Sequence, residues 1–219
     1  MKEKSPKILV AIADDHYLAR RGIRDMLKQV ETIEVVQEYD SAKALLKDVN
    51  LIQWDVIVLD IELGDGNGVE VAEQILKHRP DTKILALSAF SASKYGFMAL
   101  KSGASGFLNK DTSSADLIDA ITRVFQGHKY LNQELTNIAV EQWIRPELRK
   151  NPHENLSIRE FQVLCLLADG LGNKEIATQL NVSPKSISTY RMRVSEKLGL
   201  ENSSDLIRYA IENNLKSGS

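Results

Sequence analysis

The sequence lacks the features that mark secreted and membrane-spanning proteins. Its 219 residues include a single cysteine, Cys165, so no disulfide can form within the chain. No apolar stretch reaches the roughly 20 residues that a helix needs to cross a bilayer, and no apolar signal core follows the polar residues 1–6. These absences predict a cytoplasmic protein with no membrane partner, in which Cys165 is a buried side chain of the apolar run 161–167.

A strong net charge is also absent. The chain carries a net charge of −2; residues 1–130 have 17 basic and 19 acidic side chains, and residues 131–219 have 11 of each. Basic side chains nevertheless gather in Ser183–Lys197, where four of them stand against the single acid Glu196. A local basic helix in a neutral domain does not by itself decide whether the chain binds a nucleic acid.

The first 126 residues alternate between strand patterns and amphipathic helix patterns. Short apolar or alternating segments predict strands at residues 7–13, 33–39, 55–59, 83–87 and 105–108. Helix patterns follow each strand, at residues 18–30, 41–49, 69–77, 94–102 and 116–125. Five successive strand–helix units predict an α/β fold with a doubly wound, five-stranded parallel sheet.

Polar side chains stand at the ends of four predicted strands. The first strand runs into Asp14 and Asp15, the third into Asp60, the fourth into Ser88, and the fifth leads to Lys110. The carboxyl ends of parallel strands share one edge of the sheet, where open α/β sheets place their ligand sites. We therefore expect three carboxylates, a hydroxyl and an ammonium group to converge there.

Each of these side chains has an ordinary explanation when taken alone. An aspartate after a strand is usually a turn residue or a helix cap, and a lone lysine is usually solvated. The whole set is harder to explain as turns, because three carboxylates at one edge repel one another and favour a hard cation. Mg²⁺ is typically held by one or two carboxylates, water and phosphate oxygens. A lysine and a hydroxyl nearby would complete a clamp for a phosphoryl group.

In these residues the sequence resembles the receiver domain of two-component response regulators. The resemblance covers residues 7–126 and joins four separated motifs, Ile12–His16, Asp60–Leu63, Leu87–Ala89 and Gly103–Asp111. It implies a flavodoxin-like fold in which Asp60 is the nucleophile that takes a phosphoryl group. It also implies that Asp15, Asp60 and the backbone carbonyl of Glu62 bind Mg²⁺, with Asp14 acting mostly through water.

Three further residues acquire expected roles from the same resemblance. Lys110 pairs with the carboxylate or phosphoryl oxygens, Ser88 hydrogen-bonds the phosphoryl group, and Phe107 is the switch aromatic that turns inward behind it. Plain core packing is the ordinary alternative for Phe107, and its strand position also allows it. The sequence departs from the family at Gly64 and Tyr17, where proline is common. Neither change affects the predicted phosphoryl chemistry. The glycine-rich loop at residues 64–68 is expected to be looser than a loop with proline.

The second half carries a helix-turn-helix pattern after a linker. One helix is expected over residues 132–149, before the polar stretch 151–155. Ser157 and Glu160 form a capping-box signature, and Ser183 precedes a proline at the first position of a basic helix. Further helices are expected at residues 157–167, 173–180, 184–198 and 204–213. Two short helices joined by a tight turn, the second one basic, are typical of a helix-turn-helix. In this motif the second helix enters the major groove of DNA.

This stretch resembles the LuxR-type DNA-binding domain of the NarL/FixJ family over residues 153–215. The segments that carry the resemblance are Leu156–Glu160, Gly170–Ala177, Ser183–Arg191 and Lys197–Leu200. The resemblance implies phosphate contacts for Lys174, Ser183, Lys185, Tyr190 and Arg193. It implies that the base edges are faced by Ser188, Thr189 and Met192. The expected dimer surface on the last helix consists of Leu206, Ile207, Ala210 and Ile211.

Both of these surfaces have ordinary alternatives. The basic residues could form a solvated helix face, and part of the apolar stripe on the last helix is expected to pack on its own domain. The family often has lysine or arginine where Ser188 stands, and histidine where Tyr190 stands. A short hydroxyl cannot make the bidentate contact that arginine makes with guanine, so the DNA target cannot be copied from relatives.

The sequence therefore predicts a receiver domain at residues 5–127, a linker with a helix at 128–152 and a DNA-binding domain at 153–215. The expected function is that of a transcription factor rather than an enzyme. A sensor histidine kinase would be the phosphodonor for Asp60. The phosphorylated protein would then bind repeated promoter half-sites as a homodimer. RNA polymerase is a further candidate partner.

Two alternatives remain open at this point. The first is an orphan regulator that binds DNA without phosphorylation, against which the intact set of Asp60, Ser88, Lys110 and the acidic pair argues. The second is a metal-dependent phosphohydrolase on a related α/β fold, which would leave the helix-turn-helix half unexplained.

Overall fold

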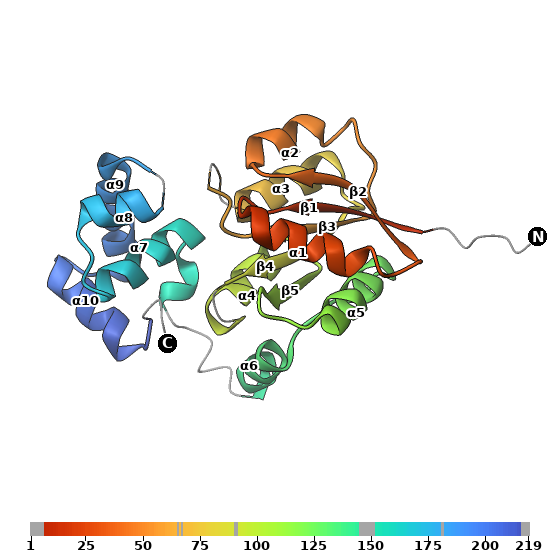
Figure 1. The fold of residues 1–219 in the computed structure, drawn as a ribbon. Helices are drawn as coiled ribbons and strands as arrows, with labels where there is room; N and C mark the ends of the chain where they lie inside the picture. The colour runs from red at the N-terminus through yellow and green to blue at the C-terminus, as the bar shows by residue number, and fades with distance from the viewer. Residues whose placement is uncertain are drawn as a thin grey trace, which may run out of the picture. The chain divides into compact units, whose positions relative to one another are not determined.

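The computed structural model describes residues 7–64, 66, 68–89, 92–144, 152–180 and 182–215. The chain divides into two compact units, residues 1–138 and 139–219, each with its own hydrophobic core (Figure 1). The division lies inside α6 (Gln133–Ile144), within the stretch that the sequence predicts as the linker. The predicted domain limits, 5–127 and 153–215, stay predictions. Among the residues described, no helix is both long enough and apolar enough to cross a membrane.

The first unit is built on a five-stranded parallel sheet, which confirms the predicted fold class. The strands are β1 (Ile8–Ala13), β2 (Ile33–Tyr39), β3 (Val56–Asp60), β4 (Lys83–Ser88) and β5 (Gly106–Asn109), and their order is β2-β1-β3-β4-β5. The chain starts in β1, steps outward to β2 and then continues on the other side of β1. That reversal lies between β1 and β3, where open α/β sheets bind their ligands.

The helices cover both faces of this sheet. They are α1 (Tyr17–Leu27), α2 (Ala42–Asp48), α3 (Gly68–His78), α4 (Ala92–Lys101) and α5 (Ser114–Phe125). Crossovers between parallel strands are right-handed. The crossover through α1 leads from β1 to β2, opposite to the direction of the later crossovers along the sheet, so α1 lies on one face. The later crossovers place α2, α3 and α4 on the other face. In agreement, α1 contacts α5 and α2 contacts α3 (Figure 1).

Alternate strand residues divide between the two faces of the sheet. The core under α1 and α5 contains Val10, Ile12, Val56, Val58, Leu85, Leu87 and Leu108, together with Leu117, Ile121 and Val124 of α5. Successive side chains of a strand point to opposite faces, so Phe107, next to Leu108, belongs to the face covered by α2, α3 and α4. The sheet is thus covered by helices on both faces.

Three strands, β3, β4 and β5, end one residue later than the sequence predicts. Asp60 pairs with Leu87, and Ser88 pairs with Asn109. These polar residues were expected to follow the strands, but their backbones continue the ladder because hydrogen bonding between strands does not depend on side-chain polarity. Asp60 and Ser88 are therefore part of the sheet itself.

The chain beyond α5 remains attached to the first unit. Tyr130 forms a parallel bridge with Gly106, and its carbonyl accepts a hydrogen bond of 3.2 Å from the N–H of Phe107. Leu135 of α6 is fully buried against Gly96 of α4, where an added Cβ would lie 2.5 Å from a Leu135 methyl group. The start of the predicted linker thus packs on β5 and α4. The predicted helix 132–149 is observed up to Ile144, and its last five residues lie outside the described residues.

Every element of the second unit that the structure describes is helical. Its elements are η2 (Pro152–Asn155), α7 (Ile158–Ala168), α8 (Asn173–Gln179), α9 (Pro184–Leu198) and α10 (Ser203–Glu212). The predicted capping box is present, because Ser157 Oγ accepts from the N–H of Glu160 and the Glu160 carboxylate accepts from the N–H of Ser157. The predicted turn at Asn181 lies partly outside the described residues.

One side of α10 packs on its own domain. Leu206 and Ala210 are 1% and 0% exposed, and Ile207 packs against the core formed by α7, α8 and α9. Ile211 is 46% exposed. The predicted dimer stripe is thus partly core, as the sequence alternative allowed, and Ile211 is the member of the stripe that a second molecule can reach.

Candidate functional site

The carboxyl ends of β1, β3 and β5 bring two carboxylates and an ammonium group into direct contact. Asp14 follows β1, Asp60 ends β3, and Lys110 follows β5. Lys110 Nζ lies 2.8 Å from Asp14 Oδ2 and 2.6 Å from Asp60 Oδ2. Both aspartates are almost fully buried. The structure therefore brings these three predicted site residues together, with Lys110 bridging the carboxylates.

Burial and charge act on Asp60 in opposite directions. Burial raises the pKa of Asp60, whereas the charge and hydrogen bond of Lys110 and the N–H of Glu62 lower it; the net pKa is raised. Burial lowers the pKa of Lys110, but attraction by Asp60 and Asp14 outweighs burial and raises it overall. The ammonium group is thus held charged between the carboxylates, and Glu62 N–H fixes Asp60 Oδ1 at 3.0 Å.

Asp14 has additional partners that fix its position. Its Oδ1 accepts from the N–H of His16 at 2.8 Å, and its backbone carbonyl accepts from Arg20 at 2.6 Å. The sequence assigns Asp14 a water-mediated contact to a metal. The structure adds a direct ion pair with Lys110, and the metal contact stays a prediction.

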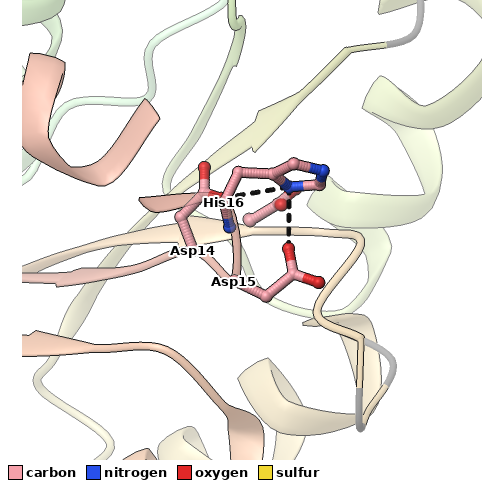
Figure 2. Close-up of side chains that lie close together, drawn as sticks. Asp14, Asp15 and His16 are labelled. Carbon is pink, nitrogen blue, oxygen red and sulfur yellow. Dashed lines mark hydrogen bonds and ion pairs between the residues drawn. The ribbon is translucent and has the colours of Figure 1, made fainter. Parts of the chain in front are cut away.

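Asp15 and His16 complete an acidic cluster at this edge. His16 Nδ1 lies 2.8 Å from Asp15 Oδ1 and 3.4 Å from Asp14 Oδ1 (Figure 2). Ligand atoms of Asp14, Asp15, His16 and Asp60 all lie within 4.8 Å of one another. The sequence motif Ile12–His16 contains His16, but no site role was predicted for it. Its position directly after two site aspartates is the sequence feature that could have indicated such a role.

The donor set of this cluster fits a divalent cation. Three carboxylates face one ammonium group, which leaves two negative charges uncompensated by lysine, and hard oxygen donors suit Mg²⁺. The loop after β3 comes close to Asp15: a Cβ on Gly64 would lie 2.7 Å from Asp15 Oδ2. Glycine at this position leaves space beside the Asp15 carboxylate that any other side chain would reduce.

Ser88 and Phe107 are both fully buried beside this edge. The carbonyl of Ser88, at the end of β4, accepts from the N–H of Lys110 at 2.8 Å, so the pairing of β4 with β5 sets the position of both residues. The burial of Phe107 agrees both with the inward orientation that the resemblance implies and with plain core packing. Its role as a switch stays a prediction.

The predicted DNA-contacting residues lie on and around α9. Lys185, Thr189, Met192 and Arg193 follow one another at helical spacing and therefore share a face. All of these except Thr189 are exposed, as are Lys174 and the N-cap Ser183. Tyr190 differs, because it is partly buried against the core of the domain.

Two hydroxyl groups of α9 are engaged within the protein. Ser188 Oγ donates to the carbonyl of Pro184 at 3.2 Å and lies 3.3 Å from Asn173 Nδ2, which donates to it. Thr189 Oγ1 donates to the carbonyl of Lys185 at 3.2 Å. Asn173 and Arg191 were not among the predicted site residues, yet Asn173 donates to Ser188 and accepts from Arg191 of the same helix. Their side-chain pairing leaves no mark in sequence periodicity.

Comparisons with known proteins identify the family of each domain. Residues 10–122 match the response regulator receiver domain family, and residues 154–210 match the luxR family of bacterial regulatory proteins. The oxygen regulatory protein NreC of Staphylococcus epidermidis is 34% identical over 213 residues, covering 94% of this chain and 98% of NreC. The response regulator UvrY of Escherichia coli is 30% identical, with 95% of each chain covered.

The chain belongs to the NarL/FixJ family of response regulators. It is thus a two-component response regulator with a receiver domain and a LuxR-type DNA-binding domain. Its relatives are regulators of transcription rather than enzymes, so the phosphohydrolase alternative is set aside.

Solved structures resemble this response regulator along almost its whole length. RcsB of Salmonella enterica serovar Typhimurium, bound to the promoter rprA in the presence of the phosphomimetic BeF3−, is 29% identical. It has a TM-score of 0.63 and covers 93% of this chain and 98% of its own. A structure of two RcsB dimers bound to two parallel DNAs is also 29% identical, with a TM-score of 0.57 and coverage of 94% and 98%.

Proposed function

We propose that this response regulator is a cytoplasmic transcription factor that binds repeated promoter half-sites as a dimer, and that phosphorylation of Asp60 controls its affinity for DNA. The observation that carries the proposal is the buried arrangement of Asp14, Asp60 and Lys110 at the sheet edge. Burying these charged groups away from water is costly. A role in phosphoryl transfer explains their arrangement better than a contribution to stability does.

In the proposed reaction, an Asp60 carboxylate oxygen forms a bond to the donor's phosphorus while the bond from phosphorus to the donor breaks. The sensor histidine kinase supplies the phosphoryl group, or a small phosphodonor does. Lys110 and the N–H of Glu62 favour the ionised carboxylate and orient it. Ser88 would donate a hydrogen bond to a phosphoryl oxygen, and Lys110 would pair with another.

Mg²⁺ fits beside these residues because the carboxylates outnumber the ammonium group. Asp15, Asp60 and the backbone carbonyl of Glu62 would hold it, with Asp14 acting through water. When bound, the cation would offset the negative charge of the phosphoryl oxygens. The binding of a divalent cation would also relieve repulsion within the cluster.

The packing of the linker supports a route from this site to the second unit. Phe107 follows Gly106 in β5, and both residues contact Tyr130 through their backbones. Leu135, five residues farther along, packs into the space that Gly96 leaves on α4. A movement of α4 or of Phe107 on phosphorylation would therefore act directly on the start of α6. That coupling is a shift between two populations.

The DNA-bound RcsB structures support both DNA binding and dimers for this chain. A single recognition helix reads only a few base pairs, so one domain would bind weakly, and linking two copies raises affinity through effective concentration. Ile211, exposed on α10, is the proposed contact between DNA-binding domains. RNA polymerase is a further proposed partner.

Phosphorylation of Asp60 can be tested together with DNA binding. The wild type is incubated with acetyl phosphate and Mg²⁺, and acid-labile phosphate and affinity for DNA selected from a genomic library are measured. Asp60→Asn should take up no phosphate and show no gain in affinity. Asp111→Asn, an exposed carboxylate next to Lys110, is the matched control and should behave as the wild type.

Each part of the proposal has its own contrary result. Acid-labile phosphate on Asp60→Asn at the wild-type level would show that the phosphoacceptor lies elsewhere. A wild type that gains phosphate but no affinity, or that binds DNA equally with and without phosphate, would favour the orphan regulator.

The dimer surface is tested by Ile211→Glu, compared with Ser204→Glu at an exposed position of the same helix. Ile211→Glu should keep the circular dichroism spectrum of the wild type and lose cooperative binding to paired half-sites. Ile207 is a poorer choice than Ile211, because it packs against the core. Unchanged cooperativity in Ile211→Glu would place the dimer surface elsewhere, such as in the receiver.

A further inference from the structure

A network of polar side chains joins three helices of the DNA-binding unit. Asn173, the first residue of α8, donates from Nδ2 to Ser188 Oγ on α9 at 3.3 Å and accepts on Oδ1 from an amino group of Arg191, also on α9. The second amino group of Arg191 donates to the hydroxyl of Ser203, the first residue of α10. The network therefore fixes the start of α8 and the start of α10 to the same face of α9.

Arg191 differs from the other basic residues of α9. Lys185 and Arg193 are exposed, whereas Arg191 is half-buried and both of its terminal amino groups are engaged by Asn173 and Ser203. These partners are neutral, so the contacts are not an ion pair, and a charge-assisted hydrogen bond is stronger than a neutral one. The planar guanidinium group holds two partners in a fixed geometry that a lysine cannot reproduce.

The hydroxyl of Ser188 is oriented by the same network. It lies on the exposed face of α9, and its two hydrogen bonds, to the carbonyl of Pro184 and from Asn173, use the proton and one lone pair. The side chain thus presents its remaining lone pair in one direction, as an acceptor. Such an acceptor suits a base-edge donor, like the amino group of adenine or cytosine in the major groove.

We infer that Asn173 and Arg191 are positioning residues that set the DNA-sequence preference of this regulator by fixing the orientation of Ser188 and of the α9 face, without contacting DNA phosphates themselves. The inference rests on the proposed function, because it assumes that α9 reads base edges. Asn173 carries no charge, so its loss removes orientation without removing electrostatic attraction to the phosphate backbone.

The test measures affinity of the full-length protein for its selected DNA site and for a scrambled duplex, over a range of salt concentrations. Asn173→Ala should lower the ratio of the two affinities about three- to tenfold, the size expected for one or two hydrogen bonds. The slope of log affinity against log salt should not change. Lys174→Ala, the adjacent exposed residue, is the matched control and should weaken binding to both duplexes and flatten that slope.

Asn173→Asp separates the two arms of the network. A carboxylate still accepts from Arg191 but cannot donate to Ser188, so the preference that depends on Ser188 should be lost. The added negative charge should weaken binding to both duplexes alike and leave their affinity ratio to report on Ser188. Ser188→Ala should reproduce that loss and add nothing to it in the double variant. Arg191→Lys should lower the affinity ratio while keeping the charge. The aspartate and lysine variants keep the test informative if Asn173→Ala unfolds.

Two results would overturn the inference. An affinity ratio equal to that of the wild type in both Asn173→Ala and Asn173→Asp would show that the network does not affect recognition. An equal loss on both duplexes with a reduced salt slope in Asn173→Ala or Arg191→Lys would show that the replaced side chain contacts phosphates. A wild type that prefers no sequence would instead contradict the proposed function, so the two failures are distinguishable.

Discussion

The edge of the sheet and the face of α9 both gather charged residues, but they hold them in different ways. At the sheet edge, Lys110 lies between two buried aspartates, and each group depends on the others for compensation. On α9, Lys185 and Arg193 are exposed, and each is solvated independently of the other. Removal of one group should therefore disrupt the whole site at the sheet edge, whereas losses on α9 should add up.

The largest expected effect comes from removing the cation at the sheet edge. Lys110→Met leaves Asp14 and Asp60 buried without their partner, and breaking a buried ion pair from one side costs about 3–5 kcal/mol. The free energy of unfolding of the receiver, measured by urea denaturation without Mg²⁺, should fall by that amount. Saturating Mg²⁺ should recover part of the loss.

Lys101→Met, at the exposed end of α4, is the control for Lys110→Met and should change stability by less than about 0.5 kcal/mol. Should Lys110→Met be as stable as this control, the two aspartates are not held as a charged pair, and the contrast with α9 disappears.

The second-largest expected effect is the stabilisation of the receiver by bound Mg²⁺. At a concentration one hundred times its dissociation constant, a ligand that binds only the folded state stabilises it by about 2.7 kcal/mol. The thermal unfolding midpoint of the receiver should rise accordingly with Mg²⁺. Asp15→Ala should remove the rise, and Asp111→Ala should keep it. A rise that persists in Asp15→Ala would show that the cation binds elsewhere.

The sequence was most informative where function requires particular residues at the ends of strands. Asp14, Asp60 and Lys110 were predicted to converge because the strand pattern placed them on one edge of a parallel sheet, and the topology rules left few alternatives. The packing of Leu135 against Gly96 could not be predicted in this way. It depends on complementary shapes on two helices that are far apart in the sequence, and neither residue is unusual in its local pattern.

The DNA-binding unit shows the same division. The capping box of Ser157 and Glu160 was predictable because it depends on residues three positions apart. The network of Asn173 and Arg191 joins three helices, and single-sequence patterns carry no information on such pairs. The α10 stripe was ambiguous because Leu206 and Ile211 are equally apolar in sequence, and only burial distinguishes core from surface.

The third prediction concerns additivity on α9. Lys185→Ala and Arg193→Ala should each weaken DNA binding at a given salt concentration about tenfold on every sequence, and each should reduce the salt slope by about one. The double variant should show the sum of the two free-energy losses, since solvated charges act independently. Thr189→Ala is the comparison, because it should change the preferred sequence instead of the slope. A double variant no weaker than either single variant would contradict independent action.

The smallest expected effect comes from His153, a partly buried titratable group of the DNA-binding unit. Its Nδ1 lies 2.9 Å from the hydroxyl of Tyr209, and the rings of Phe161 and Tyr209 lie about its own ring. Burial lowers the pKa of His153 below its usual 6.5. The unfolded chain therefore takes up a proton at a higher pH than the folded chain does. The stability that neutral His153 contributes is complete above pH 6.5 and is lost as the pH falls from there through the lowered folded pKa, by less than about 1.4 kcal/mol per pH unit.

Urea denaturation of the full-length protein at pH 7.5 and 5.5 should show a smaller loss of stability in His153→Gln than in the wild type. The control His128→Gln, at an exposed histidine after α5, should match the wild type. If His153→Gln and the wild type lose the same stability on acidification, the protonation that destabilises this unit takes place at another residue, and its aromatic pocket serves packing alone.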